Sequence, residues 1–228
     1  MHSTSCIKNL IQNTHLFDTY VFCLSKHDES MPDGLLSMWR GYGGNGNGAA
    51  IIFDTSKLNH VNGSPLTIHY VRYASKEERK RTINEKLEEF AKLLSRNHIP
   101  DQMLDLAAYM IFNRLKTEAI FTKHHGFKEE REWRALYLRE FDFEKKLESM
   151  LHYSVGKRGI EPKLKFKVQP IAAQLGIDVT LEQFVHQIIL GPSISSPLAL
   201  MSAKRMLEKV GKPSLATKLS ASSTPFRP

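Results

Sequence analysis

Apolar and polar positions alternate in several short stretches of the chain, and this pattern predicts strands. Residues 20–25, 49–53 and 66–73 are rich in aromatic and β-branched side chains and are bounded by turn-forming residues. Similar runs over residues 130–138, 163–168 and 184–190 predict the later strands.

Helical periodicity separates the early strands from the late ones. Ser75 followed by Glu78 is a capping box, and apolar residues then recur at helical spacing as far as Leu94. The helix after Pro100 is apolar on most sides through Phe112, so we expect it to lie in the core. A short helix is also predicted over residues 6–13.

The last predicted helix opens at Ser196 and Pro197, a capping serine followed by proline at the first helical position, and Gly211 ends it. The sequence therefore predicts an α+β fold: a mixed, largely antiparallel sheet with a central helical insertion at about 75–121 and a C-terminal helix. A polar tail is expected over about 212–228.

Composition narrows the class of protein. The chain has 228 residues, of which 41% are hydrophobic and 25% charged, and this predicts a single globular domain over 1–228. It has no apolar run of about 18 residues, so no membrane span is expected. Two cysteines without a Cys-x-x-Cys pair favour a cytoplasmic location and no structural zinc. The adjacent His124 and His125 lack further ligands at fixed spacing, and no metal site is predicted.

The formal charge is +8, and much of it lies late in the chain. From Leu151 onward there are eleven Lys or Arg and four Asp or Glu. In an extended segment the alternating lysines would form one basic face, which indicates a nucleic-acid-binding segment. A solvated sheet edge protected by lysines explains the same pattern. The residues concerned are Lys157, Arg158, Lys163, Lys165 and Lys167.

Two stretches carry most of the candidate chemistry, and each holds one of the two tryptophans beside an arginine. In Phe127–Leu136 an extended chain would place Glu130, Glu132 and Arg134 on one face. Two neighbouring carboxylates raise each other's pKa, and the guanidinium lowers both. Such a cluster is either a structural ion-pair ladder or a working site.

The second stretch runs from Ser37 to Gly48 and includes Trp39, Arg40 and Tyr42. Its Gly-Asn-Gly-Asn-Gly run precedes a strand and does not match the glycine spacing of a dinucleotide-binding or P-loop fold. We expect this stretch and Glu132 to share one cleft.

The order of these motifs resembles domain-of-unknown-function family 2971, found in bacteria. The matching segments are Phe22–Ser25, Met38–Tyr42 with Gly48 and Ala50–Phe53, Glu130–Arg134, Ile188–Pro192 and the closing Ser222 or Ser223 to Arg227. Most members begin with a further His-Tyr-Thr-like strand and an Asn-Asp-Pro loop. This sequence lacks both, so a shortened member or a fragment of a longer one is expected.

The usual layout of that family is similar to the ADP-ribosyltransferase fold, in which a split sheet holds NAD. The resemblance implies that Glu132 is the catalytic glutamate and that Glu130 selects the substrate. Arg40 would pair with the diphosphate of NAD, and Trp39 or Tyr42 would stack on a ring. Arg134, beside the carboxylates, is the fourth expected ligand-binding residue. The implied function is an NAD-using enzyme in phage defence or toxin action. The alternatives are a nucleic-acid-binding module and a non-catalytic structural domain in which the two tryptophans pack together.

Overall fold

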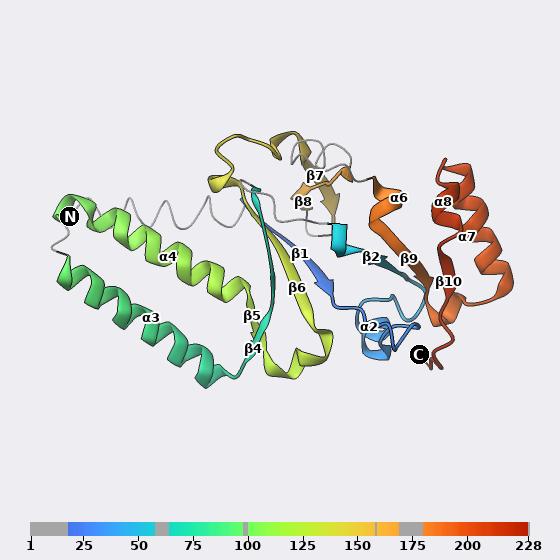
Figure 1. The fold of residues 1–228 in the computed structure, drawn as a ribbon, viewed down its shortest axis with the longest axis horizontal. Helices are drawn as coiled ribbons and strands as arrows, with labels where there is room; N and C mark the ends of the chain where they lie inside the picture. The colour runs from blue at the N-terminus through green and yellow to red at the C-terminus, as the bar shows by residue number, and fades with distance from the viewer. Residues whose placement is uncertain (1–17, 58–63, 98–99, 158, 169–179, 228) are drawn as a thin grey trace. The chain divides into compact units, whose positions relative to one another are not determined.

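The computed structural model describes residues 18–57, 64–97, 100–157, 159–168 and 180–227, so the predicted helix at 6–13 lies outside the described residues (Figure 1). Contacts divide the chain into two compact units. The first comprises Met1–Lys26 with Pro65–Leu164, and the second comprises His27–Ser64 with Lys165–Pro228. That the chain forms a single domain over 1–228 stays a prediction.

The first unit is built on a three-stranded antiparallel sheet whose central strand is β6. Its strands, in spatial order, are β1 (Thr19–Ser25), β6 (Glu132–Leu138) and β3 (Leu66–Tyr70). Directly opposed residues share a face, so Tyr20, Tyr137 and Leu66 form one apolar row. Tyr137 is almost completely buried and donates its hydroxyl to Asp142 Oδ2 at 3.0 Å, which fixes one end of the sheet.

A helical hairpin leaves the sheet through one short strand and returns through another. These elements are β4 (Arg72–Ala74), α3 (Lys76–Arg96), the 3₁₀ turn η2 (Asp101–Met103), α4 (Leu104–Ile120) and β5 (Thr122–His124). The strands β4 and β5 pair in parallel, and α3 and α4 lie side by side in opposite directions (Figure 1). The capping box of Ser75 and Glu78 is confirmed.

The hairpin differs from its prediction in one respect. In α4 only Asn113 is buried, and Met103, Leu106 and Met110 near its start are exposed. The expectation that this helix lies in the core is therefore wrong. Several of its apolar side chains are exposed in the described structure, although its composition is that of a buried helix.

Shorter elements complete the first unit. They are η3 (His125–Glu130), η4 (Arg139–Phe141), η5 (Glu148–Met150) and the antiparallel pair β7 (Leu151–Gly156) and β8 (Gly159–Leu164). The strand predicted over residues 163–168 thus ends at Leu164. The strand predicted over 66–73 is divided into β3 and β4 at the buried Val71, whose amide donates to Glu132 O at 2.8 Å.

The second unit has its own sheet, in the order β10-β9-β2. Its elements are α2 (Leu36–Gly41), β2 (Ala49–Phe53), η1 (Thr55–Lys57), α6 (Leu181–Phe184), β9 (Val185–Leu190), η6 (Pro192–Ile194), α7 (Pro197–Lys209), α8 (Pro213–Ala216) and β10 (Leu219–Ala221). β9 pairs antiparallel with β2 and parallel with β10. The N-cap of α7 at Ser196 is confirmed, since its hydroxyl accepts from Ala199 N at 3.1 Å.

The segment after Gly211 differs from the polar tail expected there. Leu215, Leu219 and Ser222 are buried, and β10 adds a parallel strand to the sheet. The composition of this segment does not reveal its structure, because α8 and β10 are short and contain few buried residues. The α+β class with largely antiparallel pairing is confirmed. No helix in the described parts of the chain is long and apolar enough to span a bilayer.

Candidate functional site

The acidic and basic stretch folds as a 3₁₀ turn followed by the central strand. Glu130 ends η3, Arg131 takes a left-handed conformation with φ of 43°, and β6 begins at Glu132. The prediction that Glu130 lies on the same strand face as Glu132 and Arg134 is therefore wrong, because the turn interrupts the extended chain. Glu132 and Arg134 do share a face of β6, as two-residue periodicity requires.

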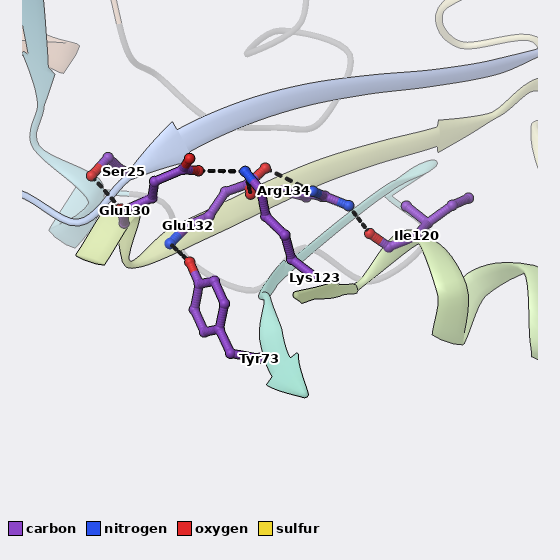
Figure 2. Close-up of polar contacts among 7 residues, drawn as sticks. All are labelled: Ser25, Tyr73, Ile120, Lys123, Glu130, Glu132 and Arg134. Carbon is purple, nitrogen blue, oxygen red and sulfur yellow. Dashed lines mark hydrogen bonds and ion pairs between the residues drawn. The ribbon is translucent and has the colours of Figure 1, made fainter. Parts of the chain in front are cut away.

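Glu132 is the centre of the cluster, and its side chain is only 5% exposed. Arg134 holds it with two hydrogen bonds, from Nε to Oε1 at 2.7 Å and from Nη2 to Oε2 at 3.1 Å. Lys123, on β5, donates from Nζ to Glu132 Oε2 at 3.0 Å. A buried carboxylate thus contacts two cations that come from different strands (Figure 2).

Lys123 joins Glu132 to Glu130, because its ammonium also makes an ion pair with Glu130 Oε2 (Figure 2). The two carboxylates therefore converge on one lysine, although only one of them lies on the strand. Ser25 Oγ donates to the Glu130 carbonyl at 2.6 Å and so fixes the turn against β1.

Backbone contacts fix the remaining partners. The Glu132 amide donates to the Tyr73 hydroxyl at 2.7 Å, and Arg134 Nη1 donates to the carbonyl of Ile120 at the end of α4 (Figure 2). The cluster therefore links β6, the end of the helical hairpin and both short strands of the first unit.

Electrostatics keep the Glu132 carboxyl ionised. Burial alone would raise its pKa, but hydrogen bonds from Arg134, Cys23 and Lys123 outweigh burial and lower the pKa to about 2. Burial would lower the pKa of Lys123, and the two carboxylates reverse that effect and raise it. Desolvation and the contact with Glu132 raise the pKa of the Cys23 thiol. At neutral pH the ionised Glu132 carboxylate thus lies beside two cations and a protonated thiol.

This arrangement can do one of two things. A buried, ionised carboxylate can stabilise a positive charge that develops beside it. The same carboxylate already accepts hydrogen bonds at both oxygens, as a structural ion pair does. No group of three or more His, Cys, Asp or Glu side chains within the described ranges is placed to hold a metal ion.

The other predicted ligand-binding residues lie in the second unit. Trp39 is buried and donates its indole N–H to the Asp33 carbonyl at 2.9 Å. Arg40 is exposed, and Tyr42 is 67% exposed. Because these residues and Glu132 belong to different units, the shared cleft stays a prediction.

The second unit gathers several motifs around the glycine-rich turn. The Gly191 amide donates to Gly48 O at 2.8 Å, and the Ser193 amide donates to Gly46 O at 3.1 Å. Gly46 has φ of +77°, and a Cβ there would lie 2.5 Å from the Ser193 hydroxyl, so only glycine fits. The run is therefore a turn packed against the end of β9.

Asp33 joins the closing Ser-rich segment to α2. Its Oδ1 accepts from the Ser223 amide at 2.9 Å and its Oδ2 accepts from the Ser223 hydroxyl at 2.5 Å, and these bonds lower its pKa. Its carbonyl accepts from Ser222 Oγ at 3.1 Å as well as from the Trp39 indole. The sequence pattern does not reveal Asp33, because it lies in a polar loop, or Lys123, because β5 is only three residues long.

The basic segment is divided by the fold. Lys163 lies on β8 and pairs with Glu161 at 2.9 Å, whereas Lys165 and Lys167 follow the strand and belong to the second unit. Lys157 lies in the turn between β7 and β8, and Arg158 lies outside the described residues. The predicted basic face of alternating lysines is wrong in its geometry, because the extended segment ends at Leu164.

Comparison with known proteins gives one match. The model of a family described as "Protein of unknown function (DUF2971)" matches residues 38–135, a range that includes Trp39, Arg40 and Tyr42 as well as Glu130–Arg134. The resemblance seen in the sequence is therefore confirmed over residues 38–135, and the segments Phe22–Ser25, Ile188–Pro192 and the closing Ser222 or Ser223 to Arg227 lie outside the matched range. No curated protein and no solved structure matches the chain.

Proposed function

We propose that this protein, which carries the DUF2971 family region over residues 38–135, is an ADP-ribosyltransferase-like enzyme that uses NAD in the bacterial cytoplasm. Its role would be in phage defence or toxin action. Glu132 is the catalytic carboxylate in this proposal, and Glu130 lies beside it to select the substrate.

One observation carries the proposal: Glu132 is 5% exposed and still ionised, with a pKa of about 2. Transfer from NAD breaks the bond between ribose and nicotinamide, and nicotinamide leaves with the bonding electron pair. The ribose carbon then bears positive charge until water or an acceptor group adds to it and loses a proton. A fixed negative charge at Glu132 stabilises that intermediate cation and accepts a hydrogen bond from a ribose hydroxyl.

The contact between Lys123 and Glu132 can be exchanged for a contact with the substrate. Its ammonium is shared between Glu130 and Glu132, whereas Arg134 alone holds Glu132 with two bonds. A ribose hydroxyl can replace Lys123 at Glu132 Oε2 while Lys123 remains paired with Glu130. Arg134 then positions Glu132 and keeps it ionised throughout the reaction.

NAD consumption tests the proposal. The purified chain is incubated with NAD, with and without candidate protein and nucleic-acid acceptors, and nicotinamide release is measured. We expect Glu132→Gln to reduce the rate by roughly 100-fold, since it removes the charge and keeps the shape. Glu148→Gln is the matched control, because Glu148 also pairs with an arginine in this unit, Arg139, but at a more exposed position.

Two results of this assay would contradict the proposal. If the wild-type protein releases no nicotinamide with any acceptor, the enzyme proposal is wrong. If Glu132→Gln keeps full activity while melting as the wild type does, Glu132 is not the catalytic residue.

A non-catalytic structural domain is the second candidate, and one observation favours it. Both oxygens of Glu132 already accept hydrogen bonds, and Arg134 also binds the carbonyl that ends α4. A cluster of this kind fixes the helical hairpin to the sheet. Under this alternative Glu132→Gln lowers the free energy of unfolding and changes no activity.

A further inference from the structure

One face of the first unit's sheet carries apolar and aromatic side chains along all three strands. Opposed residues share a face, so Leu24, Trp133 and Tyr70 form one row across β1, β6 and β3. The next row is Phe22, Ala135 and Ile68. Glu132 and Arg134 project from the opposite face of β6, so this surface is distinct from the ion cluster.

The aromatic side chains of these two rows reach the surface. Phe22 is 49% exposed, Tyr70 is 55% exposed and Trp133 is 39% exposed. The rings of Tyr70 and Trp133 meet edge to face, with centroids 6.0 Å apart and planes at 73°. Each ring therefore holds its neighbour in place while part of its surface remains available. We call Phe22, Tyr70 and Trp133 the aromatic platform.

Cations lie at the end of the sheet nearest Trp133. The Lys26 amide donates to the Arg131 carbonyl at 3.0 Å, which places these two residues side by side directly after the row of Leu24 and Trp133. Lys26 and Lys128 are exposed. The one exposed acid in the adjoining turn of this unit is Glu129, because Glu130 is paired with Lys123. Cations therefore border this end of the platform, on a chain of formal charge +8.

We propose that the aromatic platform binds single-stranded nucleic acid, in a role beyond the proposed transferase activity. Bases stack on the exposed rings, and the phosphates lie toward Lys26 and Arg131. Strands in a sheet are roughly 5 Å apart, so three strands span about 10 Å and seat two or three bases. Stacking tolerates any base, so the platform recognises the single-stranded state more than a sequence.

The chemistry of the face favours this occupant over a protein or a duplex. A duplex buries its bases in its own stack and offers aromatic rings nothing to stack on. A purely apolar protein partner does not account for the cations that border the rings. Aromatic side chains on an exposed sheet, bordered by Lys and Arg, are the combination that single strands require.

Fluorescence measures this binding directly, because Trp133 is one of only two tryptophans and the other, Trp39, is buried. Labelled ten-nucleotide oligouridylate and oligothymidylate are titrated with the protein at low salt, and both anisotropy and tryptophan emission are followed. We expect binding with quenching of the Trp133 emission. Trp133→Ala weakens binding roughly 10-fold, and Trp133→Phe keeps most of the affinity but loses the quenching.

Further variants distinguish binding at the aromatic platform from binding elsewhere on the protein. Tyr70→Ala also weakens binding and serves if Trp133→Ala does not fold, as judged by its melting curve. Lys26→Gln lowers the slope of log affinity against log salt by about 0.7, the effect of one phosphate contact on a single strand. Tyr153→Ala is the matched control, because Tyr153 is an aromatic residue, 72% exposed, on β7 and not on the three-stranded sheet.

Three results would overturn the proposal. The first is no binding of either oligonucleotide at 50 mM salt, a concentration at which electrostatic contacts are strong. The second is binding that Lys157→Gln abolishes and folded Tyr70→Ala leaves unchanged, which assigns it to the β7–β8 turn. The third is concentration-dependent dimerisation that Trp133→Ala abolishes, in the absence of nucleic-acid binding, which makes the platform a contact between copies of the chain.

Discussion

Arg134 binds both oxygens of Glu132, its neighbour two residues earlier on the same strand face, at 2.7 Å and 3.1 Å. This two-point contact joins a buried anion to a planar cation whose donors match its geometry. Arg134 also donates to Ile120 O, so the guanidinium connects the strand to the end of α4.

Replacing Arg134 by alanine should destabilise the first unit by about 3 kcal/mol, because it leaves the buried Glu132 carboxylate with one cation fewer. Arg134→Lys should recover only part of the loss, since an ammonium cannot donate in two parallel bonds. Urea unfolding measures both. Arg139→Ala is the control, because Arg139 pairs with Asp18 and Glu148 at more exposed positions and its loss should cost less.

Stability should depend on acid pH through Glu132. Its pKa in the folded protein is about 2, below the ordinary value of 4.5. A depressed pKa means that the stabilisation is fully present above pH 5 and is lost as pH falls toward 2. A shift of this size corresponds to about 3 kcal/mol. Unfolding free energies measured from pH 6 to pH 2 should fall less steeply in Glu132→Gln, and an unchanged slope would contradict the assignment.

Lys123→Met should raise the pKa of Glu132, because Glu132 loses one of its hydrogen-bond donors and faces Glu130 without a shared cation. A ¹³C titration of the glutamate carboxyls measures the change. Lys163→Met is the matched control, since Lys163 pairs with Glu161 at a more exposed position on β8. A Glu132 titration that is the same in both variants would show that Lys123 does not influence the carboxylate.

Two glycines in the second unit should respond in opposite ways to alanine. A Cβ at Gly43 would lie 2.7 Å from the Trp39 carbonyl, so Gly43→Ala should destabilise the protein by about 2 kcal/mol. A Cβ at Gly41 meets nothing within 4 Å, and Gly41→Ala at the end of α2 should be neutral or stabilise by up to about 1 kcal/mol. Thermal melting compares them, and equal melting temperatures would contradict the packing around Trp39.

Local patterns predicted the regular elements well. The capping signals at Ser75 and Ser196 are local, so they were predicted correctly. The strand alternation that put Glu132 and Arg134 on one face is local too. The periodicity of residues 130–138 did not reveal the turn at Arg131, because a left-handed residue leaves no mark in a hydrophobic pattern.

Long-range contacts escaped prediction. Lys123 reaches Glu132 only because β5 pairs with β4, and a three-residue strand is too short to carry a periodic signal. Asp33 binds Ser223, which is 190 positions away in the sequence, so the residues around Asp33 do not indicate its partner. The exposed start of α4 was misjudged for a related reason. An apolar composition favours burial of a helix, but it does not determine how much of the helix surface the rest of the fold covers.

The β4–β5 ladder is only three residues long, yet the charges beside it discriminate between its alignments. Sliding β5 by one position would turn Lys123 to the other side of the ladder and bring Thr122 or His124 in its place. Glu130 and Glu132 would then lie near each other without the cation that they share. The ion pairs of Lys123 thus favour one register of β5 against β4. Because β5 follows α4, that register also determines where the helical hairpin lies.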